Sequence, residues 1–212
     1  MSGILDLLNS EIGQKLINGA SEETGASKDQ TASVLSMGLP LLMGAMKKNA
    51  STPEGASGLL GALGSGKHDG GILNNLGSIL GGGVDKDVMS DGAGILGHIL
   101  GGKQSAVEST LSAKTGLDAG TVAKILKIAA PVLLGLIGKQ KRENNIDNGN
   151  DLSSLLGSFL GGQPQENQNL ITSLIDQDGD GSVLDDVADM VLGSKKKDAG
   201  GLGGMLGGLF GK

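Results

Sequence analysis

Two long segments of the chain, near residues 28–48 and 119–139, carry apolar residues at helical spacing. The recurrence at i, i+3, i+4 and i+7 is typical of a helix with one buried face. The apolar positions are Val34, Leu35, Leu42, Ala45 and Met46 in the first segment and Val122, Ile125, Leu126, Ala129, Leu133, Leu136 and Ile137 in the second. Pro40 and Pro131 interrupt these segments, and a proline removes a backbone donor and clashes with the preceding turn. We therefore expect each helix to kink or to restart as a second, buried helix.

Polar residues mark the start of both long helices. Ser27 with Gln30 three residues later resembles a capping box, and Asp118 occupies the matching position in the second segment. Shorter apolar segments that end near glycine predict further short helices at 57–63, 71–80, 92–100, 105–116 and 151–160. Turn-rich stretches predict loops at 64–71, 81–87 and 143–150. The whole pattern indicates an all-α protein.

The two long segments also resemble each other in sequence. Residues 24–48 align without gaps on residues 115–139, an offset of 91 positions, with eight identities in 25 positions. Pro40 pairs with Pro131 and Gly44 with Gly135. We interpret this match as an internal duplication. The predicted domains are a first helical unit at 1–80, a second, related unit at 88–162, a helix-loop-helix at 166–193 and a flexible Gly-rich tail at 194–212.

Composition limits how such a fold builds its core. The chain has 40 Gly, no Trp or Tyr, and only two Phe. Its core must therefore consist of Leu, Ile, Val, Ala and Met, which suits helices packed on helices. We expect an all-α bundle of short helices, built from two tandem related units and joined by Gly-rich loops. The lack of Cys excludes disulfides, thiolate nucleophiles and cysteine-ligated metal sites.

Charge and motifs exclude several function classes. A formal net charge of −6 and the lack of stacking aromatics argue against nucleic acid as a partner. His68 and His98 are not near each other or an acidic cluster in sequence, so no Ser-His-Asp arrangement is expected. No phosphate-loop motif is present either. We expect a protein that is not an enzyme.

The N-terminal sequence and the lack of long apolar segments bear on where the protein is located in the cell. The N-terminus has neither a basic leader nor an apolar run of signal-peptide length. No segment is expected to reach the roughly 20 apolar residues of a membrane-spanning helix. These features favour a cytoplasmic protein.

A family resemblance rests on three features. They are the repeated helix-TG-helix-Pro-helix plan, the HILGG sequence at 98–102 and the acidic DQDGDGS sequence at 176–182. Together they resemble the YidB-like family, bacterial domains of unknown function, over residues 1–192. The resemblance implies an all-α fold of short helices and leaves the biochemical role open.

Residues 176–187, DQDGDGSVLDDV, have the spacing of an EF-hand-like calcium loop. Such a loop needs oxygen ligands at positions 1, 3 and 5, a glycine at 6 and a carbonyl at 7. The residues that meet these needs, with Gly181 at position 6, are Asp176, Asp178, Asp180 and Ser182. The sequence therefore predicts one Ca2+ site.

The closing ligand departs from the standard loop. Val187 stands where a bidentate Glu is usual, and Asp185 and Asp186 precede it. We expect one of them, preferably Asp186, to complete the shell, with a weak affinity of about 10⁻⁵ to 10⁻³ M. A single loop without a second one suggests a structural element rather than a switch. The alternative is an Asp/Gly-rich turn that holds no metal and caps the next helix.

The C-terminal sequence GGLGGMLGGLFGK has an apolar stripe if it is helical. The stripe comprises Leu202, Met205, Leu206, Leu209 and Phe210. Seven glycines between residues 200 and 211 argue against a stable isolated helix. We expect a disordered tail or one that folds back on its own domain, and the alternative is an anchor on a membrane surface or in the cell envelope. An unidentified protein partner or self-association is the expected mode of action.

Overall fold

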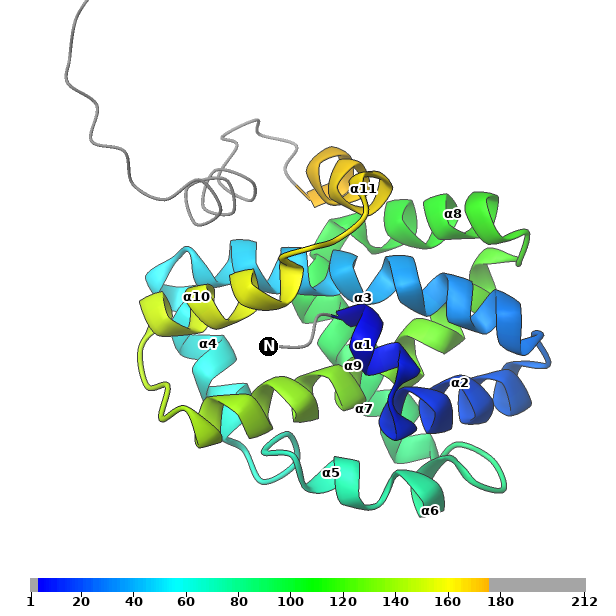
Figure 1. Ribbon diagram of the computed structural model, residues 1–212, viewed down its shortest axis with the longest axis horizontal. Coiled ribbons are helices and arrows are strands. Elements are labelled where there is room, and N and C mark those ends of the chain that lie inside the picture. Colours follow the sequence, from blue (N-terminus) through cyan, green and yellow to red (C-terminus); the bar gives the residue numbers. More distant parts are fainter. Residues whose placement is uncertain (1–3, 176–212) are drawn as a thin grey trace, which may run out of the picture.

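The computed structural model describes residues 4–175, and these residues form helices joined by short loops (Figure 1). No strand occurs in this part of the chain, so the predicted all-α class is confirmed. The elements are α1 (Ile4–Asn9), α2 (Glu11–Thr24), α3 (Lys28–Ala50), α4 (Pro53–Gly64), α5 (Gly71–Asn74), α6 (Leu76–Leu80), α7 (Lys86–Leu100), the 3₁₀ helix η1 (Gly101–Lys103), α8 (Gln104–Thr115), α9 (Ala119–Glu143), α10 (Gly149–Leu160) and α11 (Gln165–Ile175).

The long helices α3 and α9 form the centre of a single hydrophobic core. Their middle segments are buried on nearly all sides, and α2, α4, α7, α8, α10 and α11 pack around them. In Figure 1, α5 and α6 lie along the lower edge and α11 lies at the upper edge. The core is aliphatic, as the composition predicts, with Phe159 as its aromatic member among the described residues.

The predicted start signals of both long helices are present. The Ser27 hydroxyl accepts a hydrogen bond from the Gln30 backbone N–H, and the Gln30 side chain accepts one in return from the Ser27 N–H, which completes a capping box. At the equivalent place the Asp118 carboxylate accepts hydrogen bonds from the hydroxyl and the backbone N–H of Thr121. These two bonds hold the pKa of Asp118 below its ordinary value.

Local geometry at the 91-residue offset is similar in both segments. Gly25 and Gly116 both end the preceding helix in the left-handed conformation, with φ of 73° and 72°. Helices α4 and α10 each have 12 residues and follow α3 and α9 respectively. Both long helices nevertheless belong to one core. The division of the chain into two tandem units, and the domain boundaries given above, stay predictions.

Of the two expected outcomes at the prolines, a kink or a restart as a second helix, the restart is wrong. Helix α3 continues through Pro40 and α9 through Pro131. Each proline leaves the carbonyl four residues earlier, Ser36 or Lys127, without its usual helical donor. Burial of the apolar residues on both sides of the proline favours one continuous helix. Neighbouring elements contact the two carbonyls that lack a helical donor.

Different helices contact the two carbonyls. The side-chain amide of Asn167, on α11, donates to the Ser36 oxygen at 3.0 Å. On α9, Gly92 of α7 lies so close to the Lys127 carbonyl that a Cβ at this position would overlap with its oxygen. Glycine is required there because α7 could not otherwise approach α9. The two prolines thus create matching docking points for α11 and α7.

Helix α9 also corrects the expectation about membrane-spanning segments. It is the one described helix that is long and apolar enough to cross a membrane, judged by length and composition only. Its apolar window is 67% buried inside the protein, as is usual for a core helix. The helix reaches this length because it runs through Pro131, so the proline does not divide its apolar residues between two short helices.

Candidate functional site

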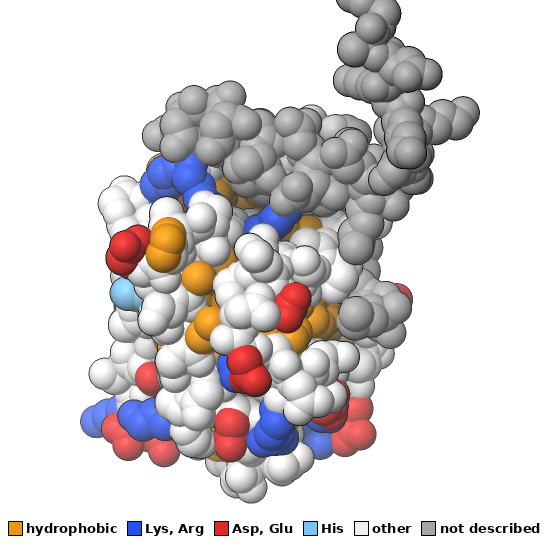
Figure 2. Space-filling model, turned by 90° about the vertical axis from the view of Figure 1, so that its left-hand side faces the viewer, with side chains coloured by type: hydrophobic (Ala, Val, Ile, Leu, Met, Phe, Trp, Pro, Cys, Tyr) orange, Lys and Arg blue, Asp and Glu red, His pale blue; other side chains and the backbone are white. Residues whose placement is uncertain are grey.

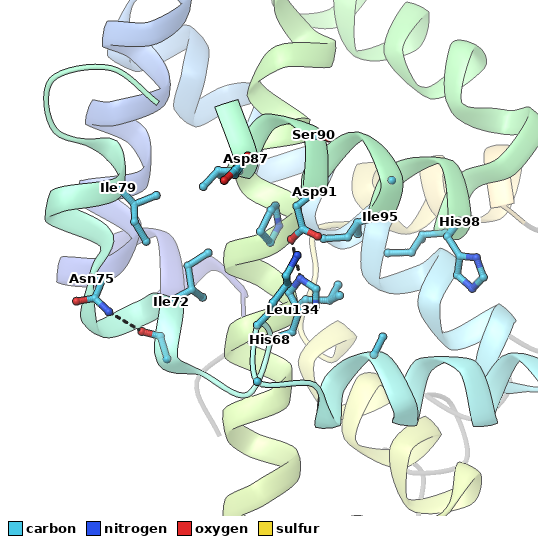
Figure 3. Close-up of a pocket in the computed structure, with 18 of the residues that line it drawn as sticks. His68, Ile72, Asn75, Ile79, Asp87, Ser90, Asp91, Ile95, His98 and Leu134 are labelled. Atoms are coloured by element: carbon cyan, nitrogen blue, oxygen red, sulfur yellow. Dashed lines mark hydrogen bonds and ion pairs between the residues drawn. The ribbon is translucent and has the colours of Figure 1, made fainter. Parts of the chain in front are cut away.

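A cavity of about 970 Å³ opens between α7, α9 and the segment from α4 to α6. We call it the α7 groove because it follows α7 from Asp87 to Ile99 (Figure 3). Its apolar lining comes from five helices and consists mainly of Leu59, Ile72, Ile79, Ile95, Ile99 and Leu134. Ile72 and Ile79 are only partly buried, so apolar surface in the groove faces solvent. A concave apolar surface of this kind is suited to bind a ligand or a peptide.

The shape of the groove depends on the loop between α4 and α5. The backbone of His68 lies so close to Gly138 of α9 that a Cβ on Gly138 would overlap with the His68 carbonyl oxygen. Gly70 adopts a φ of 104° and lies against Lys139. Asp69 faces Arg142 at 3.6 Å, on the surface. This loop is therefore held against α9, and it carries His68 into the groove wall.

His68 makes the most notable polar contact in the groove. Its Nε2 lies 2.7 Å from Asp91 Oδ2 on α7, and its Nδ1 lies 3.3 Å from the Ser65 Oγ. The histidine is only 8% exposed, and Figure 3 shows it pointing across the groove toward Asp91. The sequence analysis identified no acidic partner for His68, and the structure supplies one. The fold brings Asp91 to it from 23 residues away.

The Ser65–His68–Asp91 arrangement does not have the features of a nucleophilic triad. The Ser65 hydroxyl donates to the Ala62 carbonyl at 2.7 Å, which is shorter than its contact with His68. Its proton is thus directed at a backbone oxygen and away from a base. The residues lining the groove include His68 and Asp91 but not Ser65. The contact between His68 and Asp91 links the α4–α5 loop to α7.

Charged and polar residues lie along the groove. Asp87 and Asp91 are near the N-terminal end of α7, Lys67 lines the groove from the α4–α5 loop, and His98 lies three turns after Asp87 near the C-terminal end of α7 (Figure 3). Within residues 4–175, no three His, Cys, Asp or Glu side chains are grouped in a way that could hold a metal ion. The groove is thus an apolar surface bordered by charges of both signs.

The predicted calcium ligands, Asp176, Asp178, Asp180, Ser182, Asp185 and Asp186, all lie outside the described residues. The structure does describe the helix before them. Helix α11 occupies Gln165–Ile175, the residues directly before Asp176, as the sequence predicts for a helix entering the loop. The predicted loop and second helix, up to residue 193, and the tail at 194–212 also lie outside the described residues.

Three contacts fix α11 to the body of the protein. Asn167 donates to the Ser36 carbonyl at its N-terminal end. Ile171 packs against Gly44 so closely that a Cβ there would lie 2.7 Å from the Ile171 Cγ2. At the C-terminal end, Lys103 Nζ donates to the Ile175 carbonyl at 2.6 Å. A cation at this position also interacts favourably with the helix dipole.

The face of the molecule drawn in Figure 2 has small patches of exposed hydrophobic side chains among polar ones. Acidic and basic side chains gather together along its lower edge. Neither sign dominates that edge, so this face does not have the continuous basic surface that nucleic-acid binding requires.

Sequence reasoning missed the groove for a physical reason. Its walls come from helices separated by up to several tens of residues, and none of them carries a motif. The link between His68 and Asp91 has no local signal. For α11, Pro40 indicates that the Ser36 carbonyl needs a new donor, but the sequence does not reveal that this donor is Asn167, 131 residues away.

Comparison with known proteins gives one family. Residues 6–140 and 149–212 match the family described as "Bacterial protein of unknown function (DUF937)". The YidB-like resemblance is consistent with this family. No curated protein and no solved structure matches the chain.

Proposed function

Because the chain belongs to this bacterial family of unknown function, we propose its role from its own residues: it is a non-enzymatic protein that binds one Ca2+ through residues 176–186 and acts by binding or assembly. The observation that carries the proposal is the helix α11, which occupies the residues directly before Asp176. An EF-hand loop follows directly on an entering helix.

The chemistry of the loop supports calcium over other cations. Asp176, Asp178 and Asp180 supply hard carboxylate oxygens at alternate positions, and Gly181 suits the sharp turn after them. Calcium accepts six to eight such oxygens in flexible geometry, whereas magnesium prefers a tighter octahedron that retains several waters. Either Asp185 or Asp186 closes the shell, and the shorter reach of Asp compared with Glu weakens the binding.

A fixed entering helix favours a structural role for the ion. The contacts of Asn167, Ile171 and Ile175 hold α11 on α3 and near η1, so one side of the proposed site is fixed to the core. Calcium would then organise the residues that follow α11 and tie them to the bundle. Residues 176–193 are the ones proposed to contact a partner or a second copy.

Calorimetric titration with calcium tests the proposal. The intact chain is expected to bind one Ca2+ with a dissociation constant of about 10⁻⁵ to 10⁻³ M. Asp180→Ala should abolish the heat because it removes a carboxylate from the middle of the loop. The control, Asp147→Ala, removes an exposed acid from the α9–α10 loop and should bind as the unaltered chain does. Equal heats in all three proteins, or equal heats from magnesium, would sink the calcium assignment.

A further inference from the structure

The α7 groove is an open apolar surface whose occupant can be inferred from the chain itself. We propose that residues 199–212 of the same chain dock in the α7 groove as a short helix, with Leu202, Leu206 and Phe210 facing the groove. This inference does not depend on calcium binding, because the groove lies wholly within the described residues.

The α7 groove and the apolar stripe of the tail match in length and pattern. The groove follows α7 over 12 residue steps, or about 18 Å at the helical rise. The apolar stripe from Leu202 to Phe210 covers eight steps, or about 12 Å as a helix. The stripe recurs at i, i+3, i+4, i+7 and i+8, which places it on one face. A groove that accepts an amphipathic helix needs this set of anchors.

The described part of the chain ends beside the α7 groove. Ile175 and Ile99 line the same small cavity of about 140 Å³, and Ile99 also lines the α7 groove. The chain therefore leaves the described part beside the C-terminal end of α7, at one end of the groove. The 23 residues from 176 to 198 span at most roughly 76–83 Å when extended, whereas a compact domain of this size has a radius of gyration of about 16 Å.

This position also favours the chain's own tail over that of a second copy. A random coil of 23 residues has a root-mean-square end-to-end distance of roughly 24–29 Å, which is comparable to the size of the domain. A tethered segment of this kind experiences an effective concentration near the millimolar range. The tail of a second copy would compete only at similarly high protein concentrations.

Charged residues of the tail and of the groove bear on the direction of docking. A tail that enters beside Ile99 and runs along the groove ends near Asp87 and Asp91. Its last residue, Lys212, then lies near these two acids, while the three lysines at 195–197 remain outside the groove. Attraction between the Lys212 side chain and these acids, which Lys67 in the groove lining partly offsets, favours a docked segment antiparallel to α7.

Glycine explains why docking and folding of the tail are coupled. The seven glycines in this segment make an isolated helix unfavourable. Burial of Leu202, Leu206 and Phe210 in the groove offsets that cost only when the segment is bound. The family match also extends through residue 212, so the tail is part of the region shared with the family.

A single tryptophan can report on docking because the chain has no Trp or Tyr. In full-length Phe210→Trp we expect blue-shifted emission and acrylamide quenching several-fold weaker than in the free peptide of residues 199–212 carrying the same tryptophan. Adding Gly94→Phe should fill the groove, shift the emission to the red and restore strong quenching. Gly94 lines the groove and has open space around its Cβ position, so the fold should tolerate the change.

The matched control is Gly97→Phe in the same reporter chain. Gly97 also lies on α7 with open space around it but does not line the groove, so the emission should stay blue-shifted. Circular dichroism checks that both variants remain helical. The proposal is overturned if the reporter is as exposed as the free peptide, or if both glycine variants act alike. It is also overturned if the blue shift disappears on dilution, which would indicate a second copy, or arises only with phosphatidylglycerol vesicles, which would indicate a membrane surface.

Discussion

Replacement of Gly92 by alanine is expected to lower the free energy of unfolding by about 3 kcal/mol, at the upper end of the cost of overpacking a core. The added Cβ would overlap with the Lys127 carbonyl, a backbone atom that cannot move without displacing α9. Helix α7 would have to withdraw from α9, and the apolar contacts between them would open. Thermal unfolding followed by circular dichroism should show a midpoint roughly 6–12 °C lower, given about 2–4 °C per kcal/mol for a chain of this length.

The control for this prediction is Gly97→Ala, one and a half turns later on the same helix. Nothing lies within 4 Å of a Cβ at Gly97. Alanine should therefore stabilise α7 by up to about 1 kcal/mol through its higher helix propensity. A Gly92→Ala protein as stable as the unaltered chain would show that α7 does not pack against the Lys127 carbonyl.

Removal of the Asn167 side-chain amide is also expected to lower the free energy of unfolding. Asn167→Ala should cost about 2 kcal/mol, because the Ser36 carbonyl loses its donor and remains partly buried. The cost should depend on Pro40, since an alanine at position 40 would restore a backbone N–H to this carbonyl. In the Pro40→Ala background, Asn167→Ala is therefore expected to cost about 1–2 kcal/mol less.

Urea unfolding of the four proteins in this cycle measures the coupling. Asn169→Ala is the matched control, because Asn169 lies on the exposed side of α11 and its side-chain oxygen accepts a hydrogen bond from Gln165 at the surface. Its effect should stay within about 0.5 kcal/mol. Zero coupling between Pro40 and Asn167 would mean that α11 is not held by the carbonyl that the proline exposes.

Much of the secondary structure could be predicted from the sequence because its signals are local. Ser27 with Gln30, Asp118, Gly25 and Gly116 mark helix ends through groups only a few residues apart. The loops at 65–70, 81–85 and 144–148 fall inside the turn-rich stretches. Pro40 and Pro131 misled the prediction, because burial on both sides of each proline favours continuous helices and neighbouring elements contact the exposed carbonyls.

The candidate site was less predictable because it depends on distant contacts. His68 and Asp91 meet only when the α4–α5 loop packs on Gly138, and the α7 groove requires residues from five helices. Gly44 and Gly135 were recognised as an identical pair in the repeat. Their common role, as positions where Ile171 and Ile72 come close to α3 and α9, becomes visible only in the structure.

Hydrogen exchange of the α11 amides with and without calcium tests the central claim most directly, namely that the loop after Ile175 binds Ca2+ and is fixed to the bundle through α11. Binding to the folded form should slow exchange at the C-terminal end of α11, from Leu170 to Ile175, in the unaltered chain. Asp180→Ala should show the same exchange with and without calcium. Exchange in the unaltered chain that is insensitive to millimolar calcium would contradict the account.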